Sequence, residues 1–225
     1  MFIYTQRAMH DPTLPIVHSL PPELLGAIFE RLLDDGRTLG TSALVCSIWW
    51  AAARPFVYRK VIIRAAEDMT RLAHQIQREP RIAYWIRTLR FEGKSVPKQE
   101  LPGAIERSTV LDIDTWIYPF FSTIGTPLPN IRNFELFGFQ HLSLGRADRQ
   151  AFAEWILDLS RLEDVESLHL ARCEMPPNAL TAIIRSFPRL RAVALTCVGC
   201  RVLPHNGAEF VGLSEVSAES LHMSK

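Results

Sequence analysis

The stretch Leu20-Pro21-Pro22-Glu23-Leu24-Leu25-Gly26-Ala27-Ile28-Phe29-Glu30-Arg31-Leu32-Leu33 decides how the first part of the chain folds. Its apolar residues recur in adjacent pairs every four positions, which is the spacing of one wide apolar face on a helix. The two prolines suit a first helical turn, whose N–H groups lack intrahelical partners, and Ser19 precedes them as a possible cap. Gly36 suits the left-handed position after a helix, so the sequence predicts that the helix ends before it.

Two shorter helices are predicted next, over residues 39–46 and 47–55. A bundle of three short helices buries little apolar surface by itself. The face of the first helix is wider than such a bundle needs, and an apolar patch left over by a small module is typical of an interaction surface. The alternative is that these side chains form only the core of the local bundle.

The order Leu20-Pro21-x-Glu23-Leu24-Leu25-x-x-Ile28-Phe29-x-x-Leu32, followed by Leu44-Val45-Cys46-x-x-Trp49, resembles the F-box. The segment 56–61 resembles the one that trails F-boxes in fungal proteins, whereas the loop 34–41 is longer and richer in glycine than in the tightest members. The resemblance implies an F-box over residues 15–60 that binds the Skp-type adaptor of SCF cullin–RING ubiquitin ligases. It assigns adaptor binding to Leu20, Pro21, Leu24, Ile28, Val45 and Trp49.

A different pattern follows, beginning with a predicted strand over 61–63 and a helix over 69–76. Four strand motifs then share one shape: Ile86-x-x-Leu89-x-Phe91, Ile131-x-x-Phe134-x-Leu136, Val165-x-x-Leu168-x-Leu170 and Leu190-x-x-Val193-x-Leu195. Their first residues, at 86, 131, 165 and 190, are 45, 34 and 25 apart. Helical patterns lie between them over residues 113–124, 152–159 and 180–187. This alternation resembles a leucine-rich repeat with irregular insertions.

The predicted fold is therefore a mixed α+β and α/β chain, with a three-helix F-box followed by a small, irregular leucine-rich-repeat-like solenoid over residues 61–203. In each repeat strand the apolar positions face the core and the alternate positions face outward. We expect the outward residues to form the client-binding surface, chiefly Arg87, Arg90, Arg132, Glu135 and His169. The alternative for each of them is an ordinary solvated position. Residues 1–14 and 204–225 are expected to be tails.

The composition limits the classes of partner. Of 225 residues, 48% are hydrophobic and 22% are charged, which is typical of a globular protein. The net charge of +1 argues against nucleic acid, because proteins that neutralise many phosphates carry a concentrated positive excess. No apolar stretch approaches the roughly 20 residues of a bilayer-spanning helix. A protein without membrane contact, in the cytoplasm or nucleus, is expected.

No cofactor or metal is expected. Cys197 and Cys200 have C-x-x-C spacing, but a zinc site would have to recruit Cys173 and perhaps His205 at irregular spacing. The sequence has no phosphate-binding loop, nucleophile elbow or metalloprotease motif, so an enzyme is not expected. What the resemblance implies is the substrate-recognition subunit of an SCF-type ligase, which binds the adaptor, through it the cullin, and an unknown protein client. The alternative is a leucine-rich-repeat scaffold with an F-box fold but no ligase role.

Overall fold

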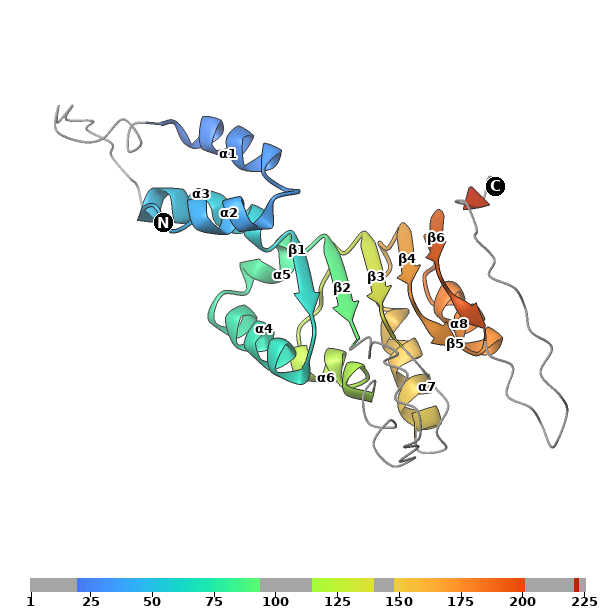
Figure 1. Ribbon diagram of the computed structural model, residues 1–225. Coiled ribbons are helices and arrows are strands. Elements are labelled where there is room, and N and C mark those ends of the chain that lie inside the picture. The colour runs from blue at the N-terminus through green and yellow to red at the C-terminus, as the bar shows by residue number, and fades with distance from the viewer. Residues whose placement is uncertain (1–19, 94–114, 140–147, 201–220, 223–225) are drawn as a thin grey trace, which may run out of the picture. The chain divides into compact units, whose positions relative to one another are not determined.

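The computed structural model describes residues 20–93, 115–139, 148–200 and 221–222 (Figure 1). The expected tail 1–14, and Ser19 as a helix cap, lie outside these ranges. The chain divides into two compact units, Met1–Val57 and Tyr58–Lys225, whereas the expected boundary fell after residue 60.

The first unit contains the helices α1 (Pro22–Arg31), α2 (Gly36–Ser42) and α3 (Ser47–Val57), which confirms the predicted helical bundle. Its core consists of side chains with almost no exposed surface, namely Leu25, Phe29, Leu39, Ala43 and Ala53. Phe29 lies at the centre, because its ring contacts both Trp49 and Phe56 of α3, with centroids 5.6 Å and 6.1 Å apart. This aromatic contact joins α1 to α3.

The turn between α1 and α2 differs from the prediction. α1 ends at Arg31, and Gly36 opens α2 instead of following α1 in a left-handed conformation. The cause is Asp35, whose carboxylate accepts hydrogen bonds from the Thr38 N–H at 3.0 Å and the Thr38 hydroxyl at 2.5 Å. Both bonds hold the pKa of Asp35 below its ordinary value, and the bond from the Thr38 hydroxyl contributes most. The cap therefore starts the second helix three residues before the predicted position.

The second unit contains a sheet of six strands within the described residues, in the order β1-β2-β3-β4-β6-β8. The parallel strands are β1 (Lys60–Ile63), β2 (Thr88–Glu92), β3 (Asn133–Phe137), β4 (Ser167–Ala171) and β6 (Ala192–Thr196). The four predicted strand motifs therefore form neighbouring strands. Equivalent motif positions pair with one another, as Leu89, Phe134, Leu168 and Val193 do.

The first strand is a fifth copy of the motif. Tyr58-x-x-Val61-x-Ile63 has the same apolar spacing, and Val61 pairs with Leu89 of β2. The predicted alternation is confirmed in β2 and β3, where Leu89, Phe91 and their β3 partners are buried between less buried residues. One face of the sheet is therefore apolar and the other carries polar side chains.

Helices cover the apolar face of the sheet. They are α4 (Ala66–Arg78), α5 (Arg81–Trp85), α6 (Phe120–Ile124), α7 (Asp148–Leu159) and α8 (Pro177–Arg185), and their buried residues share one core with the strands. The prediction of a single helix over residues 113–124 is wrong. Pro119 separates the 3₁₀ turn η2 (Thr115–Ile117) from α6, because a proline has no N–H to continue a helix.

The sheet changes character at its last strands. The short strands β5 (Glu174–Met175) and β7 (Gly199–Cys200) pair beside the main sheet. The strand β8 (Leu221–His222), in the stretch expected to be a tail, pairs antiparallel with Ala192 and Val193 of β6. Val193 and Leu195 are only half-buried, unlike their counterparts in β2–β4. Among the described residues, no helix has both the length and the apolar character needed to cross a membrane.

Candidate functional site

The first unit exposes large apolar side chains, although its own core is complete. α1 divides its apolar face in two, since Leu25 and Phe29 are fully buried while Leu24 and Ile28 are 52% and 39% exposed. The α2–α3 turn and α3 add further exposed side chains. Together they form the exposed apolar set: Leu24, Ile28, Leu44, Val45, Ile48 and Trp50.

The structure separates the six predicted adaptor-binding residues into two groups. Pro21, Leu24, Ile28 and Val45 are exposed, and Pro21 is also the residue that caps α1. Leu20 and Trp49 are instead half-buried and pack against the core of the first unit. These two residues therefore support the bundle and offer a partner less surface.

Sequence reasoning missed three members of the exposed apolar set, which are Leu44, Ile48 and Trp50. Leu44 is 81% exposed, more than any other large apolar side chain described. The ring of Trp50 lies 5.3 Å from the Arg54 guanidinium carbon, in a cation–π contact. The signal that could have found these residues is the apolar run from Leu44 to Trp50, which is longer than one buried helix face requires.

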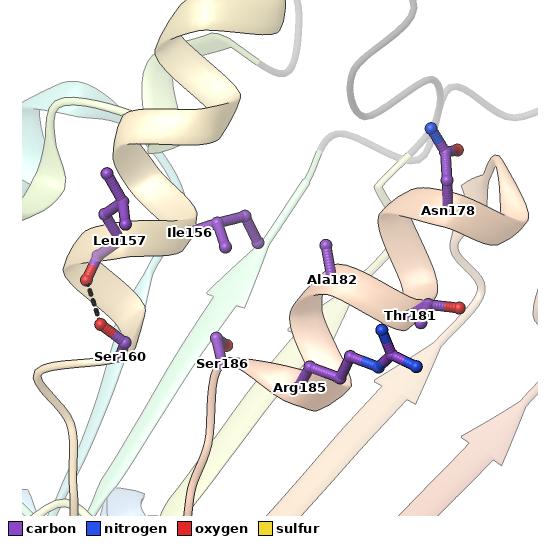
Figure 2. A pocket seen from close by; sticks show the side chains of 8 residues that line it. All are labelled: Ile156, Leu157, Ser160, Asn178, Thr181, Ala182, Arg185 and Ser186. Carbon is purple, nitrogen blue, oxygen red and sulfur yellow. Dashed lines mark hydrogen bonds between the residues drawn. The ribbon is translucent and has the colours of Figure 1, made fainter.

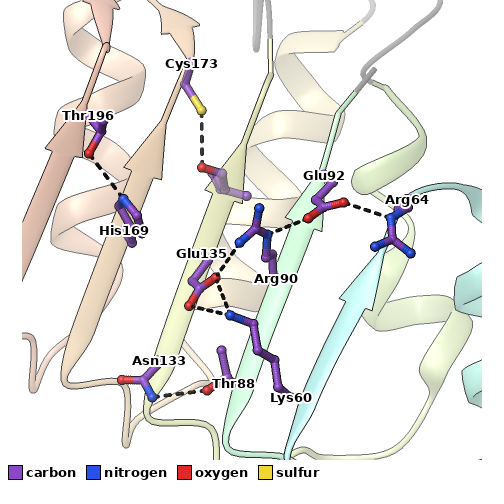
Figure 3. Close-up of polar contacts among 11 residues, drawn as sticks. Lys60, Arg64, Thr88, Arg90, Glu92, Asn133, Glu135, His169, Cys173 and Thr196 are labelled. Carbon is purple, nitrogen blue, oxygen red and sulfur yellow. Dashed lines mark hydrogen bonds and ion pairs between the residues drawn. The ribbon is translucent and has the colours of Figure 1, made fainter. Parts of the chain in front are cut away.

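The polar face of the sheet carries an array of paired charges (Figure 3). Glu135 of β3 lies 3.2 Å from Lys60 Nζ and 3.5 Å from Arg90 Nη1, so Lys60 reaches across β2 to meet it. Glu92 lies 2.7 Å from Arg90 Nε and 2.8 Å from Arg64 Nε. We call these five residues the strand-face network. It neutralises most of its own charge, which leaves Arg90 and Glu135 less available to a ligand than expected.

The remaining predicted client-binding residues lie apart from the strand-face network. His169 of β4 has its Nε2 3.4 Å from the hydroxyl of Thr196. Arg87 and Arg132 each precede the first residue of a strand, and they lie beside each other because the Arg132 N–H donates to the Arg87 carbonyl at 2.9 Å. The structure therefore places Arg87 with Arg132, and Arg90 with Glu135.

Phe137 is a further member of the polar face that the sequence did not identify. The guanidinium carbon of Arg90 lies 4.7 Å from its ring centroid, and that of Arg172 lies 5.5 Å from it. Arg172 has a positive φ of 53° directly after β4. Both guanidinium groups are attracted to the Phe137 ring, because the face of an aromatic ring carries partial negative charge.

An open groove of about 660 Å³ lies between α7 and α8 (Figure 2). Ile156 and Leu157 of α7 face Thr181, Ala182 and Arg185 of α8 across it. Among the described residues that line this groove, Arg185 alone is charged. Acid–base chemistry needs convergent titratable groups, and the groove does not bring such groups together.

The described cysteines do not assemble a metal site. Cys173 is buried, and its thiol lies 3.3 Å from the Ala171 carbonyl and 3.5 Å from that of Leu136, whereas Cys197 is exposed. Within the ranges that the structure covers, no three His, Cys, Asp or Glu residues are grouped as metal ligands. The side chains of Cys200 and His205 lie outside the described part.

No curated protein and no solved structure matches the chain. The helical unit does match a family model, and the match extends from residue 17 to residue 64. It therefore includes α1, α2, α3 and β1, and with them the whole exposed apolar set. The chain contains an F-box-like domain at residues 17–64, which supports an F-box protein.

Proposed function

We propose that this protein is an F-box protein of the fungal type and the substrate-recognition subunit of an SCF-type ubiquitin ligase. F-box domains generally bind Skp-type adaptors, and the F-box-like domain suggests such a role here. In this proposal the exposed apolar set binds the adaptor, which links the chain to a cullin. The second unit binds the client protein. The chain itself catalyses no reaction and needs no cofactor.

The observation that carries the proposal is the divided apolar face of α1. Leu25 and Phe29 belong to the buried core of the first unit, whereas Leu24 and Ile28 remain exposed. The apolar side chains of Leu24 and Ile28 are therefore not needed to build that core. Burying one large apolar side chain contributes roughly 1.5–3 kcal/mol. A few such anchors at the centre of an interface supply most of a binding energy. The exposed apolar set therefore has the chemistry of a docking surface for another protein.

The second unit supports client binding through its regular strands. Five parallel strands among the described residues place equivalent motif positions in register, as expected for a leucine-rich-repeat-like solenoid. The alternate positions form a surface of polar side chains held on strands. Such a surface suits protein recognition, because a sheet positions side chains more rigidly than a loop does.

The proposed mechanism is proximity. A receptor that holds the adaptor with one unit and the client with the other raises the effective concentration of the client beside the ubiquitin-loaded enzyme. The strand-face network combines cations with carboxylates, and this mixture of signs favours a protein client over a uniform polyanion.

Co-purification tests this function. The tagged full chain is expressed in cells, and the captured proteins are identified by mass spectrometry. The wild type is expected to retain a Skp-type adaptor and a cullin, and Leu24→Asp with Ile28→Asp is expected to lose both. Leu157→Asp is the matched control, because Leu157 is 67% exposed on α7 of the other unit. Capture of a client without adaptor or cullin by the wild type would instead support the scaffold alternative.

A further inference from the structure

We propose that Arg59, Arg87 and Arg132, which we call the arginine column, bind an extended carboxylate-rich segment of the client protein. The inference deepens the proposed function, on which the identification of the ligand as a client rests. The three residues come immediately before β1, β2 and β3. They therefore lie at the amino ends of the three strands, one position before each strand begins.

Backbone hydrogen bonds hold the column together. The Arg59 carbonyl accepts from the N–H groups of Arg87 and Thr88, both at 2.9 Å. The Arg87 carbonyl accepts in the same way from Arg132 at 2.9 Å and Asn133 at 3.0 Å. Neighbouring strands of a sheet lie about 4.8 Å apart, so the repeated pattern sets the spacing of the three arginine backbones.

The cations of the arginine column differ from those of the strand-face network in that they are not paired with carboxylates of the described residues. Arg64, Arg90 and Lys60 each lie within 3.5 Å of a carboxylate. The side chains of the arginine column make no hydrogen bond or ion pair to any residue that the structure describes. Arg59 and Arg132 are exposed and Arg87 is half-buried.

Three like charges in adjacent positions of neighbouring strands disfavour the unliganded sheet. An anionic ligand removes this repulsion, and the guanidinium fork matches a carboxylate with two parallel hydrogen bonds. In an extended peptide, side chains on one face recur about every 6.7 Å, which lies within reach of arginines spaced by one strand. Two or three acidic residues of such a peptide are therefore matched by the column.

Glu166 limits the column at one end. Its N–H donates to the Arg132 carbonyl at 2.9 Å, so it takes the next position after Arg132. Arg191 occupies the position after Glu166, where its N–H donates to the Glu166 carbonyl at 2.8 Å. Because a carboxylate repels an acidic peptide, Glu166 confines the ligand to the three arginines before it.

The test measures fluorescence anisotropy of a labelled hexaglutamate peptide with the purified full chain at low ionic strength. The triple variant Arg59→Gln, Arg87→Gln and Arg132→Gln is expected to bind about tenfold more weakly or worse, since each charge-assisted hydrogen bond is strong. Arg37→Gln, Arg78→Gln and Arg185→Gln form the matched control, because they remove the same charge from exposed positions on helices. This control is expected to bind almost as the wild type does.

A second variant, Glu166→Gln, tests the proposal through a gain in affinity for hexaglutamate instead of a loss. It is expected to tighten hexaglutamate binding severalfold by extending the cationic surface toward Arg191. Equal weakening in the two triple variants would overturn the proposal, as would tighter binding of a thymidine oligonucleotide with the same charge. Adaptor capture is read on the same proteins. If the wild type binds the adaptor but the two triple variants bind hexaglutamate equally, the arginine column alone is overturned. If the two triple variants differ in hexaglutamate binding but the wild type binds no adaptor, the ligase role alone is overturned.

Discussion

Leu24 and Leu25 are consecutive residues of α1, yet Leu24 is 52% exposed while Leu25 is completely buried. This contrast predicts that the same substitution lowers stability strongly at Leu25 and hardly at all at Leu24. Leu25→Ala is expected to lower the free energy of unfolding of the first unit by about 2–5 kcal/mol, because it leaves a cavity beside Phe29. Leu24→Ala is expected to change it by less than about 0.5 kcal/mol. Urea denaturation followed by circular dichroism measures both, and equal losses would contradict the division of the helix face.

Trp49 and Trp50 provide a second pair of neighbours with different roles. Trp49 packs against Phe29, so Trp49→Ala is expected to destabilise the first unit by about 3 kcal/mol or more. Trp50 is 39% exposed, and Trp50→Ala is expected to weaken adaptor binding while costing about 1 kcal/mol or less for the lost contact with Arg54. Parallel measurements of unfolding and adaptor affinity separate the two effects. Loss of adaptor affinity only in Trp49→Ala would exclude this assignment.

Glu135 joins three strands through its ion pairs. Its side chain is 19% exposed and lies near both Lys60 and Arg90. Glu135→Gln is expected to lower the free energy of unfolding of the second unit by about 1–2 kcal/mol, because it leaves two cations facing each other. The matched control is Asp164→Asn, which breaks the more exposed pair with Arg189 and is expected to cost under about 1 kcal/mol. A larger loss in the control would show that the strand-face network does not stabilise the sheet.

Asp35 makes the stability of α2 depend on pH. Its pKa is lowered in the folded state by the hydrogen bonds from Thr38, chiefly that of the hydroxyl. A lowered pKa means that the charged form stabilises the fold above the ordinary value of 3.8, and that this contribution disappears as pH falls through the folded-state pKa. Asp35→Ala is therefore expected to reduce the denaturation midpoint at neutral pH and to have little effect in strong acid. A pH-independent difference between variant and wild type would mean that the cap is not ionic.

The most periodic parts of the chain are those that the sequence predicts well. The paired apolar residues of α1 and the repeated strand motifs have one stable solution each, because their periods match a helix and a half-buried strand. The register of β2, β3, β4 and β6 follows from the motifs themselves. The strand over residues 61–63 is predicted from the sequence, but its place as the first copy of the motif becomes clear only from its pairing with β2.

Other features depend on contacts that a linear pattern does not specify. The start of α2 depends on the bonds between Asp35 and Thr38, which compete with the glycine signal at Gly36. The pairing of Arg90 with Glu135 depends on strand register, so both residues resemble free surface charges in the sequence. The division between Trp49 and Trp50 depends on how α3 packs against Phe29.

The most direct test of the account is a calorimetric titration of the purified full chain with a purified Skp-type adaptor at several temperatures. The account predicts a complex with a negative heat-capacity change, because apolar surface is buried on binding. It also predicts that Leu24→Asp with Ile28→Asp abolishes the complex while Leu157→Asp leaves it intact. Absence of binding by the wild type, or unchanged affinity in the double variant, would contradict the claim that the exposed apolar set binds the adaptor.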